Sequence, residues 1–230
     1  MTNAIAAYWN ERIHDLEMTD EPVGTLRFFD ALDDYRFDKL RYLPRLVDFA
    51  GYRGKRLLEV GCGVGTDLVR FARGGAHVTG VDLAEQSIAL AQSNFELHGL
   101  GGQADLRVGN GEALPFSDES FDVTYGHGVL QYTHDARRMV LECRRVLAPG
   151  GQAIFMVYNR VSWLNAMFTD KIEAAGFDKM PQEFQDLLVR VLRIQADCEI
   201  GGPHLYVREW LLEAPSAEDQ WKVAKTAAED

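Results

Sequence analysis

The sequence predicts an α/β fold: a doubly wound, mostly parallel sheet that carries an N-terminal helical cap. Three observations support this prediction. Short apolar runs recur between residues 57 and 158, most of them border glycine-rich or acidic turns, and segments of helical periodicity separate several of them. This alternation is typical of a parallel sheet covered by helices. The 230-residue chain is 47% hydrophobic, enough to bury such a core in one large domain.

The first 53 residues are expected to form the cap. Apolar side chains recur at helical spacing in residues 4–18 and again in residues 40–50, which predicts at least two helices before the first strand. The segment between them is aromatic and acidic. Its aromatic residues include Phe28, Phe29, Tyr35 and Phe37. Two interpretations stay open: these rings pack the helices on the sheet, or they form a lid that excludes water from a bound ligand.

The most informative segment is residues 57–67, which read LLEVGCGVGTD. An apolar strand carrying Glu59 breaks into a glycine turn and resumes as a helix over about residues 65–73, an order typical of a nucleotide site. Glycine exposes bare backbone N–H groups and accepts a positive φ, so a ligand can lie against this turn. The helix also directs its positively polarised N-terminus there. The turn residues expected to contact the ligand are Gly61, Cys62, Gly63 and Gly65.

The spacing of the glycines separates two kinds of nucleotide site. A dinucleotide fingerprint has the pattern G-x-G-x-x-G, and counted from Gly61 its third glycine falls on Thr66. The pattern here is E-x-G-x-G-x-G, with Glu59 two residues before the first glycine. A nicotinamide-dependent oxidoreductase is therefore the less favoured alternative.

The second expected strand, residues 76–81, ends in Asp82, about twenty residues beyond the glycine turn, where an open α/β sheet delivers a second carboxylate. A carboxylate can accept hydrogen bonds from both hydroxyls of a ribose. Asp82 is therefore predicted to bind the ribose, and Leu83 to lie on an adenine face. The alternative is that Asp82 caps the helix expected over residues 84–98, and both roles are compatible.

Three more strands are expected farther along the chain. Residues 104–108 form the third and lead into an Asn-Gly turn. Residues 121–125 form the fourth and lead to Gly126 and His127. A helix end, a Pro-Gly-Gly turn at residues 149–151 and a fifth strand follow.

These five segments, in this order over roughly residues 55–160, resemble the class I S-adenosylmethionine-dependent methyltransferases, in their small-molecule branch. The resemblance implies a Rossmann-like sheet, S-adenosylmethionine as cofactor and S-adenosylhomocysteine as product. It implies methyl transfer by direct displacement to oxygen, nitrogen or carbon of a small metabolite. Asn110 stands where the family usually has an acidic residue at the adenine edge, and a plain turn is the alternative there. The residues that the resemblance adds to the cofactor site are Asn110, Gly111, Glu112 and Gly126.

Direct displacement needs alignment more than a reactive side chain, and a base only if the acceptor must lose a proton. His127 is the first candidate, because it follows the fourth strand and its ordinary pKa suits neutral pH. Packing beside the donor without proton exchange is the alternative for His127. Tyr158 and Tyr132 are candidate substrate contacts. Asp67 either binds the amino acid part of the donor or caps the helix N-terminus.

Composition limits the partners. The formal net charge of −11 disfavours nucleic acid, which binds clustered Lys and Arg. The three cysteines, Cys62, Cys143 and Cys198, lack the spacing of a metal site, so no metal is expected. No run of about eighteen apolar residues and no secretory signal is found, so neither membrane insertion nor export is expected. We expect a cytoplasmic protein with a small-molecule acceptor, as a monomer or homodimer.

The expected organisation is a cap over residues 1–53, a cofactor-binding core over residues 54–160, and C-terminal elements of the same domain over residues 161–230. Helices are expected at residues 162–175 and 181–194, and closing antiparallel strands at residues 189–199 and 204–213, two assignments that overlap. Asn110 and the short C-terminal region leave open a cofactor-binding regulatory or assembly protein without transferase activity.

Overall fold

The computed structural model describes residues 2–11, 13, 16–41, 43–158, 204–207, 209–210 and 221–222. Its centre is a six-stranded sheet of order β3-β2-β1-β4-β5-β6. The strands β1 to β5 run parallel, and β6 joins β5 antiparallel. The predicted mostly parallel, Rossmann-like sheet is thus confirmed. The strand bounds are Arg56–Val60 for β1, His77–Asp82 for β2, Ala104–Val108 for β3, Phe121–His127 for β4, Leu147–Tyr158 for β5 and His204–Val207 for β6.

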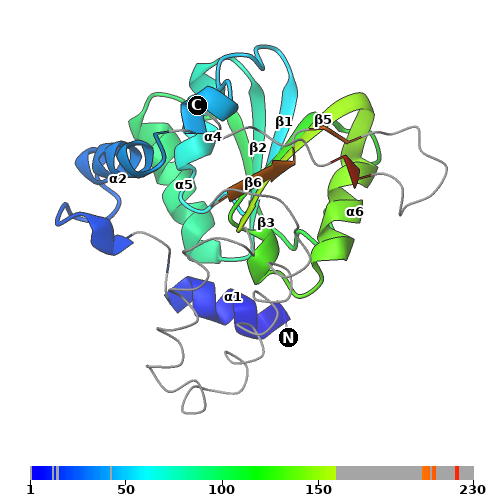
Figure 1. The fold of residues 1–230 in the computed structure, drawn as a ribbon. Helices are drawn as coiled ribbons and strands as arrows, with labels where there is room; N and C mark the ends of the chain where they lie inside the picture. The colour runs from blue at the N-terminus through cyan, green and yellow to red at the C-terminus, as the bar shows by residue number, and fades with distance from the viewer. Residues whose placement is uncertain are drawn as a thin grey trace.

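Helices cover both faces of this sheet (Figure 1). The helices α4, Thr66–Arg73, and α5, Glu85–Leu97, lie on one face, and α6, Ala136–Val146, lies on the other. The central strand shows why both faces must be covered. Leu57 packs with the α4 side and Leu58 with the α6 side, and both are fully buried. A strand that is apolar on both faces is typical of a doubly wound sheet.

The cap differs from its predicted layout. It consists of α1, Thr2–Glu11, a short 3-10 turn η1, Leu16–Met18, the helix α2, Leu26–Lys39, and the four-residue helix α3, Leu43–Leu46. The aromatic segment expected between two helices is itself the longest helix of the cap, begun by Thr25, whose hydroxyl accepts from the Phe28 N–H. Among the described residues of the range 40–50, which was expected to be a helix, the structure has the four-residue helix α3. Leu43 of α3 and Val47, which directly follows this helix, are buried.

The predicted Pro-Gly-Gly turn lies inside β5 instead of before it. The pairing of β4 with β5 shifts register between Phe121 and Val123, so the turn residues form an irregularity of the strand. At the C-terminal side, the prediction of an antiparallel strand from residue 204 is confirmed for β6. The short strands β7, Glu209–Trp210, and β8, Trp221–Lys222, pair separately. The helices predicted at 162–175 and 181–194 and the strand at 189–199 lie outside the described residues.

Candidate functional site

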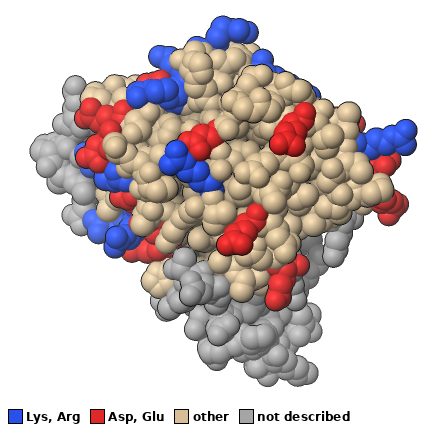
Figure 2. Space-filling view, turned by 180° about the vertical axis from the view of Figure 1, so that it is seen from behind, with Lys and Arg blue, Asp and Glu red and all other residues tan. Residues whose placement is uncertain are grey.

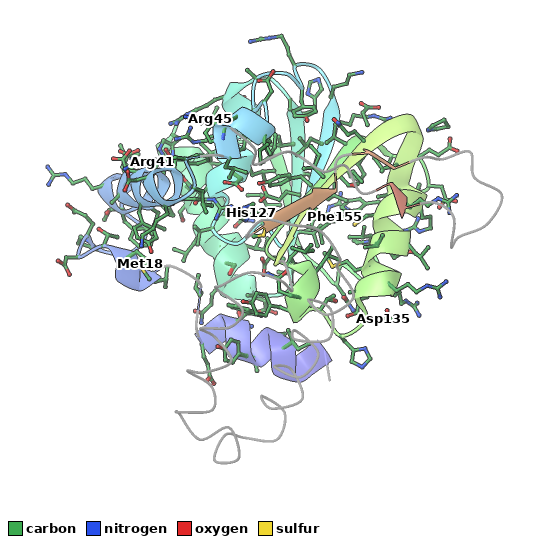
Figure 3. The ribbon with its side chains drawn as sticks, viewed as in Figure 1. Met18, Arg41, Arg45, His127, Asp135 and Phe155 are labelled. Carbon is green, nitrogen blue, oxygen red and sulfur yellow. The ribbon has the colours of Figure 1, made fainter. Side chains whose placement is uncertain are left out.

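A cavity of about 380 Å³ opens at the carboxyl ends of β1, β2, β3 and β4, and the cap forms its outer wall. This edge is where open parallel sheets bind ligands, and the volume is that of a small-molecule site. Figure 3 shows His127, the last residue of β4, near the middle of the molecule, with α1 beneath the strands. The predicted site residues that line the cavity are Glu59, Gly61, Cys62, Gly63, Asp67, Asp82, Leu83, Asn110, Gly111 and His127.

The three glycines of the turn are there for three different reasons. A Cβ at Gly61 would come within 2.5 Å of a Val129 methyl carbon, so this glycine permits close packing. Gly65 precedes α4 and lies against Ala91 of α5, and it does not line the cavity. Of the three, Gly63 alone faces open space, with φ at +52° and no atom within 4 Å of the position that an added Cβ would take. Gly63 therefore presents bare main chain to the cavity, as a ligand-contacting turn requires.

Asp82 at the end of β2 joins the two ligand-facing loops. Its Oδ2 accepts from the Gly63 N–H at 2.9 Å, and its Oδ1 accepts from the Ala84 N–H at 2.9 Å at the start of α5. Burial raises the pKa of Asp82, and these backbone hydrogen bonds oppose the rise. Asp82 does not cap α5, whose N-cap is Ala84 with no side-chain bond, so the capping alternative was wrong. Each Asp82 oxygen holds one backbone donor and keeps further acceptor capacity, as the predicted ribose contact would need.

A buried network lies on the floor of the cavity. Arg36 of α2 grips Asp67 of α4 through two bonds of 2.6 Å each, and the Tyr125 hydroxyl donates to the same carboxylate at 2.8 Å. Burial opposes ionisation of Asp67, but Arg36 prevails and the pKa of Asp67 is lowered. Asp67 does not cap α4, whose N-cap is Gly65 with no side-chain bond, so the capping alternative was wrong.

Glu59 lies beside this network, and one of its carboxylate oxygens lacks a hydrogen-bond donor. It is 4% exposed, and its Oε2 has no hydrogen-bond partner. Burial raises the pKa of Glu59 well above its ordinary value, and the neighbouring charge of Asp67 adds to the rise. A buried carboxylate oxygen without a donor, facing a cavity, is suited to a cationic or N–H-bearing ligand group.

Sequence reasoning missed Arg36, which lines the cavity beside this carboxylate. Only tertiary packing brings α2 over α4. The sequence did contain one signal. Asp33 and Arg36 are three residues apart on α2, and Asp67 and Arg70 are three residues apart on α4, so each helix offers one acid and one arginine to the other. A second ion pair joins the two helices in the opposite direction. Arg70 of α4 donates to Asp33 of α2, from Nε to Oδ1 at 2.7 Å and from Nη2 to Oδ2 at 2.5 Å.

The segment after β3 is only partly as predicted. Asn110 and Gly111 line the cavity, but the Asn110 side chain accepts from the Glu112 N–H, an Asx turn. Glu112 does not line the cavity. Its Oε1 accepts from the Thr133 hydroxyl at 2.5 Å and from the Asp135 N–H at 2.9 Å, which ties this loop to the start of α6. Gly126 is also outside the lining, where Phe155 and Val129 press on it.

The candidate base His127 and the candidate substrate contact Tyr158 lie at the ends of the neighbouring parallel strands β4 and β5. His127 pairs with Met156 in the register of β4 and β5, and both residues line the cavity. The ring centroids of His127 and Tyr125 are 6.4 Å apart, so His127 adjoins the Asp67 network. Tyr132 also lines the cavity and meets Trp9 of α1 edge to face at 5.4 Å between centroids. The backbone of Tyr158 closes β5.

No group of three or more His, Cys, Asp or Glu side chains suited to a metal ion occurs among the described residues. Within the same part of the chain, no helix combines the length and apolar character needed to cross a membrane. Cys62 lines the cavity, but burial raises the pKa of its thiol well above the ordinary value, so it is a small wall residue and not a nucleophile.

A parallel sheet with a glycine turn after its first strand and a carboxylate after its second defines a nucleotide-binding protein of the doubly wound class. Residues 58–155 match the family model of a methyltransferase domain. This part of the chain is a class I S-adenosylmethionine-dependent methyltransferase domain, as its relatives also show. S-adenosylmethionine is the cofactor of this family.

Curated relatives agree on the class. An O-methyltransferase, rstn1, of Aspergillus nomiae is 39% identical over 101 residues, 44% of this chain and 45% of the relative. The ubiquinone biosynthesis O-methyltransferase of Hahella chejuensis is 38% identical over 142 residues, 58% of this chain and 57% of the relative. The chain spans about half the length of most of the curated relatives it matches.

Solved structures share the fold. Magnesium protoporphyrin IX methyltransferase from Synechocystis, with bound SAH, superposes with a TM-score of 0.57 at 18% identity, over 74% of this chain and 78% of that one. The [4+2]-cyclase SpnF superposes with a TM-score of 0.56 at 22% identity, over 70% of this chain and 62% of that one. A cyclase and a methyltransferase thus share this fold, so the activity must be argued from the site.

Proposed function

We propose that this chain binds S-adenosylmethionine in the cavity and transfers its methyl group to an oxygen atom of a small-molecule acceptor. The observation that carries the proposal is the pairing of the open main chain at Gly63 with the unpartnered Glu59 Oε2 beside it. One surface fits the uncharged body of a nucleoside, and the other fits a cationic amine. A dinucleotide would instead place a pyrophosphate, a dianion, against these buried carboxylates.

Five residues of the chain fit the parts of the cofactor. Asp82 would accept from the ribose hydroxyls, and Leu83 and Asn110 would flank the adenine. Glu59 would accept from the amino group of the methionine part. The guanidinium of Arg36 uses Nε and Nη2 on Asp67, which leaves Nη1 to meet the carboxylate of that part.

When bound, the sulfonium of S-adenosylmethionine supplies a methyl group that is already activated. The chain then has to align the acceptor with that methyl and exclude water. Ile5, Trp9 and Ile13 of the cap line the outer wall of the cavity, opposite the strand ends. An apolar wall of this kind excludes water from the site. Alignment can supply about 7 to 11 kcal/mol of the barrier.

His127 is proposed as the base that takes a proton from an acceptor hydroxyl. It lines the cavity at the end of β4 and lies close enough to Asp67 for the two side chains to interact electrostatically. His127→Ala is expected to leave S-adenosylhomocysteine affinity unchanged and to slow transfer about 100-fold or more. Wild-type activity should fall as pH drops through the histidine pKa, and the variant should lose this dependence.

Two observations support a small acceptor and an oxygen nucleophile. The net charge is −11, and on the face in Figure 2 acidic and basic side chains lie interspersed on a largely uncharged surface, which does not favour a phosphate backbone. Several matched relatives are O-methyltransferases by name. Oxygen transfer also gives His127 a proton to remove.

The test combines binding with transfer. Calorimetry is expected to show binding of S-adenosylhomocysteine and none of NADH. Methyl transfer from labelled S-adenosylmethionine is then measured over a panel of phenols, catechols, amines and acids. Turnover of hydroxyl acceptors supports the proposal. Tight binding without turnover of any acceptor would favour a cofactor-binding protein without transferase activity, and NADH binding would contradict the assignment of the cavity.

A further inference from the structure

Helix α2 presents one stripe of side chains to the cavity. Its members recur at helical spacing and are Leu32, Tyr35, Arg36 and Lys39, and Leu40, the C-cap of the helix, also lines the cavity. The stripe combines an aliphatic and aromatic surface with two cations. The two cations have different surroundings, and this difference carries the inference.

Arg36 has a carboxylate partner, whereas Lys39 has none among the described residues. The Arg36 guanidinium is held by Asp67 through two bonds of 2.6 Å. Lys39 forms no ion pair with any carboxylate among the described residues, and its ammonium lies 5.1 Å from the centroid of the Tyr35 ring. The neighbouring Asp38 on α2 is paired with Arg41, away from the cavity. Lys39 is thus a cation on the cavity wall that lacks a carboxylate in the described structure.

The other charged side chains that line the cavity are paired with each other or assigned to the cofactor, so Lys39 is available to the acceptor. The carboxylates that line the cavity are Glu59, Asp67 and Asp82. Asp67 is committed to Arg36, and the other two fit parts of the cofactor. The whole chain carries a net charge of −11, so an anionic acceptor would be repelled unless a local cation attracted it.

We propose that Lys39 binds an acidic group of the acceptor, so that the methylated small molecule is a carboxylic acid with an apolar or aromatic body lying along Leu32, Tyr35 and Leu40. This inference rests on the proposed function, since it assigns the remaining part of the same cavity. It makes Lys39 a specificity-determining residue that contacts the acceptor and not the cofactor.

The experiment compares matched acceptors that differ only in charge. A dihydroxybenzoate and the corresponding dihydroxybenzamide share their ring and hydroxyl groups. Wild-type enzyme is expected to prefer the acid at least tenfold in kcat/KM. Lys39→Gln should lower kcat/KM for the acid about tenfold through KM, leave the amide unchanged and leave S-adenosylhomocysteine affinity unchanged. Lys39→Arg should retain most of the preference. Lys55→Gln, the same charge change outside the cavity lining, is the matched control.

Each contrary result overturns the inference. Equal or faster turnover of the amide by the wild type would show that no cation selects the acceptor. An equal loss on acid and amide in Lys39→Gln would show a structural role, and a loss of S-adenosylhomocysteine affinity would assign Lys39 to the cofactor. Failure of the proposed function has a different signature: the wild type then fails to bind S-adenosylhomocysteine or to methylate any acceptor.

Discussion

Glu59 shows how a residue can be unfavourable for the empty protein and useful to the loaded one. Its carboxylate is buried with one oxygen unpartnered, and its pKa is raised by burial first and by Asp67 second. A buried polar group without a partner costs about 1 to 3 kcal/mol, and more when it is charged. A ligand amine that donates to Glu59 would remove this cost. The free energy stored at the site would thus appear as cofactor affinity.

Glu59→Gln is therefore expected to raise stability and to weaken binding. The amide cannot ionise, so the free energy of unfolding at pH 7 should rise by about 1 kcal/mol or more. S-adenosylhomocysteine affinity should fall about tenfold, because a charged hydrogen bond is lost. Chemical denaturation and calorimetry measure the two effects. A variant that is less stable, or that binds equally well, would contradict this account of Glu59.

Gly63 is the second residue whose role can be isolated. Gly63→Val is expected to abolish S-adenosylhomocysteine binding, because the side chain would occupy the space that the ligand needs. Gly54→Val is the matched control, since Gly54 also has a positive φ, +74°, and no atom within 4 Å of an added Cβ, but lies outside the cavity lining. Both variants carry backbone strain of about 1 to 3 kcal/mol. Equal binding by both variants would show that the cofactor lies elsewhere.

At the scale of elements, α2 and α4 are joined by two ion pairs of the same geometry and different burial. In the inner pair, the side chains of Arg36 and Asp67 are 21% and 1% exposed, and in the outer pair those of Arg70 and Asp33 are 32% and 26% exposed. The outer arginine also lies over the Phe37 ring, 3.5 Å from its centroid. The inner pair therefore forms both the interface of the cap and the floor of the site.

The two pairs should differ in their contribution to stability. Arg36→Met leaves Asp67 buried without its partner and is expected to cost about 3 to 5 kcal/mol. Arg70→Met leaves a partly solvated Asp33 and should cost about 1 kcal/mol. Adding Asp67→Asn to Arg36→Met should recover part of the loss, because the uncompensated charge is gone. Denaturant unfolding of the four proteins tests this, and equal costs for the two arginine variants would contradict it.

For the whole molecule, the buried carboxylates Asp67, Glu59 and Asp82 predict that the free energy of unfolding depends on pH. It should fall at low pH, the lower limb of the profile, and fall again at higher pH, the upper limb. The lowered pKa of Asp67 adds stability that is present above its ordinary 3.8 and is lost as pH falls through the folded-state pKa. The raised pKa of Glu59 acts in the opposite sense. Its cost is absent below the ordinary 4.5, grows as pH rises from there toward the folded-state value, and is constant above that value. Asp82, whose pKa is also raised, belongs to this upper limb.

Stability of the protein without ligand is thus expected to peak on the acid side of neutrality. Asp67→Asn should flatten the fall below about pH 4, and Glu59→Gln should flatten the fall above the peak. Each limb has a slope of up to about 1.4 kcal/mol per pH unit for each proton involved. Denaturant unfolding between pH 3 and 8 measures both limbs. A profile of the wild type that rises continuously from pH 4 to pH 8 would contradict the assignment of Glu59.

Much of the sheet and half of the site could be predicted from local sequence. Residues 104–108 form a strand as expected, and the strand expected over residues 76–81 is found at 77–82, because apolar runs between turn residues favour strands. Asp82 and Gly63 line the cavity, and the sequence could point to them because strand ends and glycine turns are local signals. Helix α2 was missed, since its mixed aromatic and acidic residues have weak amphipathic periodicity, and its burial comes from contacts with α4 and α5.

The sequence by itself determined which chemical groups follow which strands: a glycine turn follows β1, a carboxylate ends β2 and a histidine ends β4. Parallel strands must bring these three groups to one edge of the sheet. Only the tertiary structure decided that Arg36 meets Asp67, that Glu112 holds a loop instead of a ligand, and that Lys39 reaches the cavity. Those pairings join residues 21 to 31 positions apart or place one face of a helix against a cavity. Local periodicity carries no information about such contacts, because they depend on how the cap packs on the sheet.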